Sequence, residues 1–162
     1  MEQTPVQNSL KEKFTSEIIS IDENSDILTV TVNKSSIREI IQFLKDELGF
    51  VFLTDLCGIH YPDNDLPLGV VYHLHNLSQN IRIRIKTFTL TEHPEIDSIT
   101  AIFSSANWME RETYDFYGID FVGHPNLIRI LNVEYLDYFP MRKEYPLEDT
   151  TRTDKDDRFF GR

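Results

Sequence analysis

Three acidic side chains in one short run could act as acid and base or bind a cation: Glu110, Glu112 and Asp115. On a helix with about 100° per residue, Glu110 and Glu112 point to nearly opposite faces, so they cannot act together on one substrate. Trp108, Glu112 and Asp115 share a face, which places an aromatic side chain beside two carboxylates, as at many protein interfaces. Arg111 is expected to pair with Asp115, four residues later. The run favours a binding surface, and an ordinary amphipathic surface helix is the alternative.

Other reactive side chains give weaker signals. Cys57 is the single cysteine, so it forms no internal disulfide and cannot hold an iron–sulfur cluster by itself. It follows an apolar strand, where an inert buried thiol is expected. His73 and His75 point to one side of a strand, but no third ligand lies near them in the sequence. We therefore predict no metal site, and a stand-alone hydrolase using Glu112, Asp115 and a histidine is a distant alternative.

The elements that position these residues follow from hydrophobic periodicity. Strands are expected at residues 18–21, 27–32, 50–56, 68–77 and 80–90, where β-branched residues gather or alternate with polar ones.

One helix should begin with a capping box of Ser36 and Glu39 and end at Gly49. A second, residues 98–117, has a predicted cap at Asn107 and ends at Gly118. No helical crossover separates the last three strands, so we predict an α+β two-layer sandwich: a mostly antiparallel sheet with helices on one face, plus an extended C-terminal arm.

Two regions are predicted along the chain. Residues 1–131 form the α+β domain, and residues 132–162 form an extended partner-binding segment and tail. The tail has too little apolar surface to fold alone. We expect it to lie across a neighbouring subunit and insert Phe159 and Phe160, and simple disorder is the alternative.

The net charge of −11 argues against nucleic acid or an anionic membrane surface as the main partner. No apolar run reaches the roughly 18 residues of a membrane span. The first five residues have no basic region or apolar core, so no signal peptide is expected there. The stripe of Arg82, Arg84 and Lys86 is expected on the solvated face of the sheet. The chain is expected to reach a membrane only through a complex.

Two ordered sequence blocks carry a family resemblance. The first runs from Glu110 to Ile119 and continues through Phe121, Gly123-His124-Pro125 and Arg129-Ile130-Leu131. The second is Pro140-Met141-Arg142-Lys143-Glu144-Tyr145-Pro146-Leu147. Together they resemble the signature of the C subunit of proton-pumping NADH:quinone oxidoreductase, the thirty-kilodalton-type subunit of respiratory complex I.

The resemblance implies a non-catalytic subunit of the peripheral arm, on the cytoplasmic face of the bacterial cell membrane. It would pack against the large quinone-site subunit and neighbouring iron–sulfur subunits, which with others would carry the flavin and clusters; none is expected on this chain. The alternative is the equivalent subunit of a membrane-bound hydrogenase or a related quinone-linked dehydrogenase.

The resemblance also implies that His124 donates hydrogen bonds that fix the loop after Gly118. Arg142 and Lys143 are expected to form a basic knuckle for a partner carboxylate, and a solvated loop is the alternative. The candidate partner-binding or loop-fixing residues are Trp108, Glu110, Arg111, Glu112, Asp115, Gly118, His124, Pro125, Arg129, Arg142, Lys143, Phe159 and Phe160.

Overall fold

A five-stranded sheet forms one layer of the molecule, with strand order β1-β2-β5-β4-β3. The structure is a computed structural model that describes residues 4–22 and 27–146. The strands of this sheet are β1 (Ile18–Asp22), β2 (Leu28–Val32), β3 (Phe52–His60), β4 (Leu68–Asn76) and β5 (Ile81–Thr89). All neighbours pair antiparallel except β2 and β5, which run parallel.

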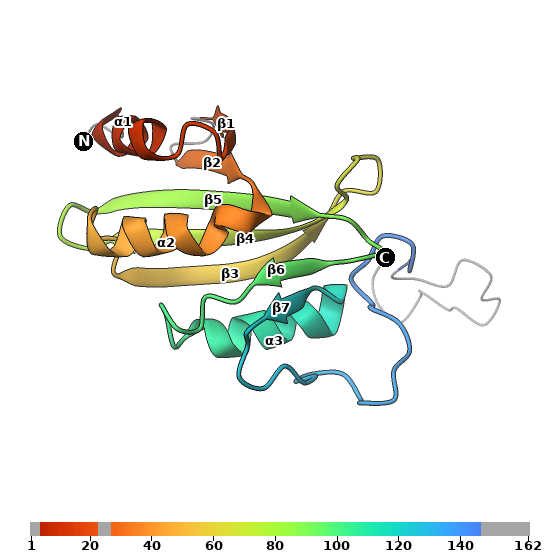
Figure 1. The fold of residues 1–162 in the computed structure, drawn as a ribbon. Coiled ribbons are helices and arrows are strands. Elements are labelled where there is room, and N and C mark those ends of the chain that lie inside the picture. The colour runs from red at the N-terminus through yellow and green to blue at the C-terminus, as the bar shows by residue number, and fades with distance from the viewer. Residues whose placement is uncertain (1–3, 23–26, 147–162) are drawn as a thin grey trace, which may run out of the picture.

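The remaining elements form the second layer and its edges (Figure 1). They are α1 (Thr4–Lys13), η2 (Lys34–Ser36), α2 (Ile37–Asp46), β6 (Glu95–Asp97), α3 (Ala106–Tyr117) and β7 (Asp120–Val122), with β6 and β7 paired in parallel. In Figure 1, α1 lies near β1 and β2, α2 lies over the sheet and runs along its strands, and α3 lies with β6 and β7 on the β3 side. The predicted α+β sandwich with a mostly antiparallel sheet is confirmed.

The buried face of the sheet explains why α2 packs on it. Val30, Ile85, Tyr72 and Leu56 pair in sequence across four strands, and each is at most 3% exposed. The helix contributes its own fully buried stripe: Ile37, Ile40, Ile41 and Leu44. Burying these apolar side chains is the main favourable term in folding.

The opposite sheet face carries the basic stripe, as predicted. Along β5, Ile83 and Ile85 are fully buried, whereas Arg82 is exposed and Arg84 and Lys86 are partly exposed. Within the described residues, no helix combines the length and apolar character needed to cross a bilayer.

Both predicted helix caps are wrong. The Ser36 hydroxyl donates to the Glu17 carboxylate at 2.6 Å, so it makes no cap for α2. The second helix begins at Ala106 instead of residue 98, because residues 98–105 form turns that pack on β7 and on Glu110. The left-handed backbone at Gly49 and Gly118, each with φ of +70°, confirms both helix ends.

Candidate functional site

An extended segment, residues 123–146, follows β7 and runs along α3 without regular secondary structure (Figure 1). It exposes many large apolar side chains: Ile128, Leu131, Val133, Tyr135, Tyr138, Met141 and Tyr145. Tyr135, for example, is 87% exposed. Apolar side chains gathered on one exposed segment are typical of a protein-binding surface. We call residues 127–146 the anchored segment, because buried polar groups fix its backbone.

Asp115 is the main anchor. Its carboxylate is fully buried on α3 and accepts five hydrogen bonds. One oxygen accepts from the Arg129 guanidinium at 2.7 Å and from the Asn132 amide at 3.1 Å. The other accepts from the backbone N–H groups of Ile130, Leu131 and Asn132 at 2.8–3.1 Å. A single side chain therefore fixes three consecutive backbone groups of the anchored segment.

The electrostatics of Asp115 favour the ionised form. Burial alone would raise its pKa, but hydrogen bonds from the Asn132 and Leu131 N–H groups and from Arg129 bring the pKa well below the usual value. A carboxylate accepting several N–H groups is ionised throughout the physiological range. Asp115 is therefore a structural anion and has no proton to donate to a substrate.

Arg129 links three parts of the site. Besides Asp115, its guanidinium donates to the carbonyl oxygens of Leu136 at 2.8 Å and Tyr138 at 3.3 Å. It also lies 5.1 Å from the centroid of the Phe139 ring. Because its side chain is only 9% exposed, Arg129 acts inside the protein and offers little surface to a partner.

The predicted ion pair between Arg111 and Asp115 is wrong. Arg111 instead donates to the backbone carbonyls of Ile128 and Arg129, both at 3.0 Å, and its guanidinium lies over the Trp108 ring at 5.1 Å. Asp115 is covered by the anchored segment, which brings Arg129 closer than helical spacing brings Arg111. Trp108 and Glu112 are exposed on α3, whereas Asp115 is buried. The prediction that all three side chains share one exposed face is therefore also wrong.

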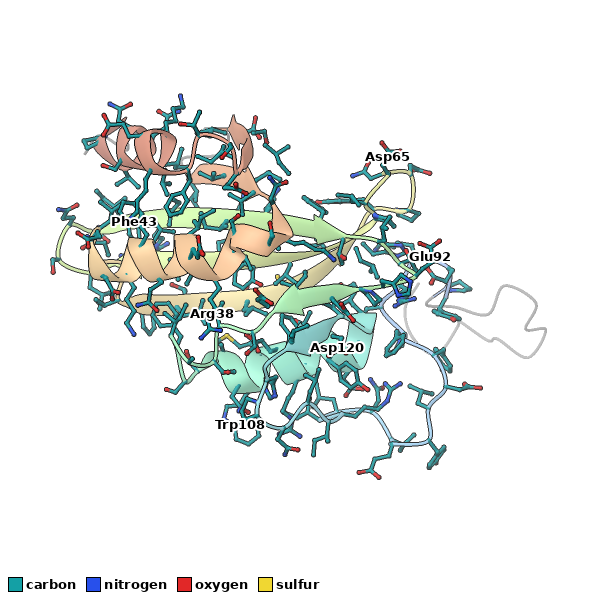
Figure 2. All side chains as sticks on the ribbon, in the orientation of Figure 1. Arg38, Phe43, Asp65, Glu92, Trp108 and Asp120 are labelled. Carbon is teal, nitrogen blue, oxygen red and sulfur yellow. The ribbon has the colours of Figure 1, made fainter. Side chains whose placement is uncertain are left out.

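Trp108 and Glu112 do lie on the surface. Trp108 is 61% exposed, and its side chain projects from α3 away from the sheet (Figure 2). Glu112 is exposed as well, whereas Glu110 is fully buried, as their helical spacing predicts. An exposed aromatic beside charged groups fits a partner contact.

Glu110 fixes the turn before α3. Its carboxylate accepts from the Ser98 hydroxyl at 2.7 Å and from the Ile99 N–H at 2.8 Å. Burial raises its pKa to about 7, although these two hydrogen bonds oppose the shift. Among the described residues it forms no ion pair.

His124 joins the loop after β7 to α3. Its Nδ1 accepts from the Asn126 N–H at 3.0 Å, so its Nε2 carries the proton and donates to the Asn107 carbonyl at 3.1 Å. This arrangement is the loop-fixing contact expected from the sequence. Pro125, the next residue, is exposed.

The second sequence block turns back onto the end of α3 and β3. Arg142 donates to the Tyr117 carbonyl at 2.7 Å, and the Lys143 N–H donates to His60 at 2.9 Å. The Arg142 side chain is only 12% exposed and lies near Glu144. The basic knuckle for a partner carboxylate stays a prediction. The Lys143 side chain is exposed.

Phe159 and Phe160 lie outside the described residues. The predicted boundary between residues 131 and 132 falls within the backbone run that binds Asp115, and this division stays a prediction.

We expect Gly118→Ala to destabilise the protein by more than Gly123→Ala. Both glycines have positive φ, +70° and +84°, which costs an alanine roughly 1–2 kcal/mol. At Gly118 a Cβ would also come 2.4 Å from the Phe139 ring, whereas at Gly123 nothing lies within 4 Å. Urea unfolding of the two variants measures the added cost of the clash between the new Cβ and the Phe139 ring. Equal losses would show that the ring moves aside without a cost in stability.

The geometry does not support a hydrolase. Asp115 is buried and fully hydrogen-bonded, and Glu112 is exposed on the same helix, so the two cannot act as acid and base on one substrate. Burial raises the pKa of the Cys57 thiol to about 11, which opposes nucleophilic reactivity. In the part of the chain that the structure describes, no group of three or more potential ligands could hold a metal ion.

Sequence reasoning missed several residues that complete the site. Asn132 donates twice to Asp115, Phe139 packs on Gly118, and Ser98 binds Glu110. Ser98 falls in the predicted helix 98–117 and Asn132 in a stretch without periodicity, and only the fold brings them to the carboxylates of α3. The excess of aromatics after residue 131 was the available signal for Phe139.

The chain is a small two-layer α+β fold whose anchored segment exposes apolar side chains. Comparison with known families gives the assignment: the family model for the 30 kDa subunit of respiratory-chain NADH dehydrogenase matches residues 30–151. The chain belongs to this family, as the resemblance indicated, and is thus a subunit of NADH-quinone oxidoreductase, an oxidoreductase complex.

Individual relatives agree. The C subunit of NADH-quinone oxidoreductase from Citrifermentans bemidjiense is 43% identical over 143 residues, covering 88% of this chain and 89% of the relative. Its counterpart from Sinorhizobium medicae is 44% identical over 122 residues; that match covers 74% of this chain but only 60% of the longer relative.

Two solved structures share the fold. A trypsin-resistant fragment (1–134) of Nqo5 has a TM-score of 0.67 and 31% identity, covering 75% of this chain and 98% of the fragment. A chain of a membrane-bound sulfane sulfur reductase, an archaeal respiratory membrane complex, has a TM-score of 0.75, covering 89% of this chain and 85% of that chain. At 20% identity, the second match concerns the fold alone.

Proposed function

We propose that this chain is a non-catalytic scaffold subunit in the peripheral arm of a proton-translocating NADH:quinone oxidoreductase. It binds the large quinone-site subunit and neighbouring iron–sulfur subunits on the cytoplasmic face of the bacterial membrane. Flavin and iron–sulfur clusters reside on other subunits, and this chain binds none of them. Its role in electron transfer from NADH to quinone is to hold its neighbours in register.

One observation carries this proposal: the anchored segment exposes apolar side chains while its backbone is fixed by buried polar groups. Leu131 shows the division, because its N–H binds buried Asp115 while its side chain is 66% exposed. Ordering a segment before binding lowers the entropic cost of association. The arrangement supports a preformed surface for a stable partner, and the names of the relatives support complex I as the setting.

We expect Leu131→Asp to reduce recovery of the quinone-site subunit with the tagged full chain by about tenfold or more, since burying an unpaired carboxylate in an interface costs several kcal/mol. The substitution keeps the backbone bond to Asp115, so the chain should remain folded. Ile19→Asp is the matched control, because Ile19 is similarly exposed, at 58%, but lies on β1 at the far edge of the sheet. Recovery that falls equally in both variants, or in neither, would contradict the proposed surface.

A further inference from the structure

A pocket of about 310 Å³ lies between edge strand β3 and α3, beside the anchored segment. Its lining residues are Cys57, Gly58, Glu112, Thr113, Phe116, Tyr117 and Met141. The lining includes residues of α3, which belongs to the first sequence block, and Met141 of the second block. The hydrogen bonds that fix the anchored segment do not use the side chains that line this pocket.

The walls of the pocket are fixed by the fold. A Cβ at Gly58 would come 2.3 Å from the Tyr117 ring, so only glycine lets the helix approach the strand this closely. On the other side, the Met141 N–H donates to the Phe116 carbonyl at 3.2 Å, which places Met141 at the C-terminal end of α3. The pocket is therefore lined by two aromatic side chains and a thioether, with the Tyr117 ring held against Gly58 and the Met141 backbone held at the end of α3.

The charge of the pocket is negative. Glu112 is its one charged lining residue, it is exposed, and it forms no ion pair with any residue that the structure describes. Asp55 does not line the pocket; it is half exposed, lies 3.7 Å from His73 and is close enough to Cys57 to raise the pKa of that thiol. Burial first, and then the negative charges of Asp55 and Glu112, raise the pKa of Cys57, so the thiol is neutral and does not add to this charge. The nearby cation Arg84 is bound to His73 at 2.8 Å.

We propose that this pocket receives an arginine side chain from the partner subunit that covers the anchored segment. The guanidinium pairs with Glu112 and stacks on the aromatic walls, while its apolar stem contacts Met141. A planar guanidinium suits both a carboxylate and an aromatic face, whereas a lysine ammonium is a compact, strongly hydrated charge. This inference rests on the proposed function, because it requires a partner subunit at this surface.

Charge reversal in the full chain tests the pocket. We expect Glu112→Lys to lower recovery of the assembled complex by about tenfold and Glu112→Gln by less, because the first repels a guanidinium and the second only removes an ion pair. Glu12→Lys is the control, since Glu12 is an exposed acid on α1, and α1 lies on the other side of the molecule from β3 and α3 in Figure 1. Equal recovery of the Glu112→Lys and Glu12→Lys variants would overturn the inference.

A crosslink identifies the occupant. With a photoreactive phenylalanine at position 141, the crosslinked partner peptide should contain the arginine, and changing that arginine to glutamate should be rescued by Glu112→Arg. A crosslinked peptide without arginine, or the absence of rescue, would each refute the arginine. Failure of the unmodified chain to recover any respiratory complex would instead refute the proposed function.

Discussion

Replacing Asp115 with asparagine is expected to lower the free energy of unfolding by about 3–5 kcal/mol, the range for removing one partner of a buried ion pair. The carboxylate accepts on both oxygens, from Arg129 and Asn132 on one and from three backbone N–H groups on the other. An asparagine amide has a single acceptor oxygen, so in either orientation its NH₂ group faces other donors. Arg129 would also keep a buried, unpaired charge.

Urea unfolding of the full chain measures this loss, and limited proteolysis shows where it arises. Cleavage should appear first within residues 127–146. Glu112→Gln is the control on the same helix and should change stability by less than about 0.5 kcal/mol, because its side chain is exposed. A loss below about 1 kcal/mol for Asp115→Asn would mean that the carboxylate does not anchor the segment.

Asp115→Asn should also weaken the dependence of the free energy of unfolding on pH in the acid range. A carboxyl group whose folded-state pKa is lowered adds stability above its unfolded pKa, about 3.9 for aspartate. This stability is lost as the pH falls through the folded-state value. Asp115→Asn has no such group, so its free energy of unfolding should fall less steeply in acid than that of the unchanged protein.

Glu110 is expected to make the free energy of unfolding fall as the pH rises, which is opposite to the effect of Asp115, and Glu110→Gln should remove this dependence. The folded-state pKa of Glu110, about 7, lies above its ordinary value of 4.5. The contribution of Glu110 to the free energy of unfolding is therefore complete below pH 4.5 and is lost as the pH rises from 4.5 to 7. The loss is roughly 3 kcal/mol, since one unit of pKa corresponds to about 1.4 kcal/mol. Glutamine stays neutral and keeps a carbonyl acceptor for Ser98 or Ile99.

Stability curves from pH 4 to pH 8 for the unchanged chain and the variant provide the measurement. The difference between the two curves should change by roughly 3 kcal/mol across this range, with Glu110→Gln gaining relative stability at the alkaline end. Glu112→Gln, on the exposed face of α3, should parallel the unchanged protein. Parallel curves for Glu110→Gln would show that burial does not shift this carboxyl group.

The local patterns in the sequence explain what could be predicted. Alternation along residues 81–89 and the apolar stripe of residues 37–48 each require one buried face, so strand, helix and sandwich follow from them. Glycine at positions 49 and 118 marked both helix ends because its backbone readily becomes left-handed. The parallel pairing of β2 with β5 was not predictable, since it joins strands far apart in the chain.

The candidate site was predictable in its members but not in its contacts. Asp115 and Arg129 both stood out, yet spacing favoured Arg111 as the partner of Asp115. The true pair spans a stretch with no periodicity, where only tertiary packing decides which cation reaches the carboxylate. The failed cap of α2 has the same cause, because Ser36 binds the distant Glu17 in place of its own helix end.

The central claim is that this chain acts by binding within a respiratory complex. The most direct measurement is purification of the tagged full chain from its own cells, with polypeptide composition, absorption spectrum and NADH:quinone reductase activity of the recovered material. We predict stoichiometric recovery with a flavin- and iron–sulfur-containing assembly that oxidises NADH, and a colourless isolated chain after dissociation. A chain that purifies free of any such assembly, or that keeps a redox cofactor when alone, would contradict the account.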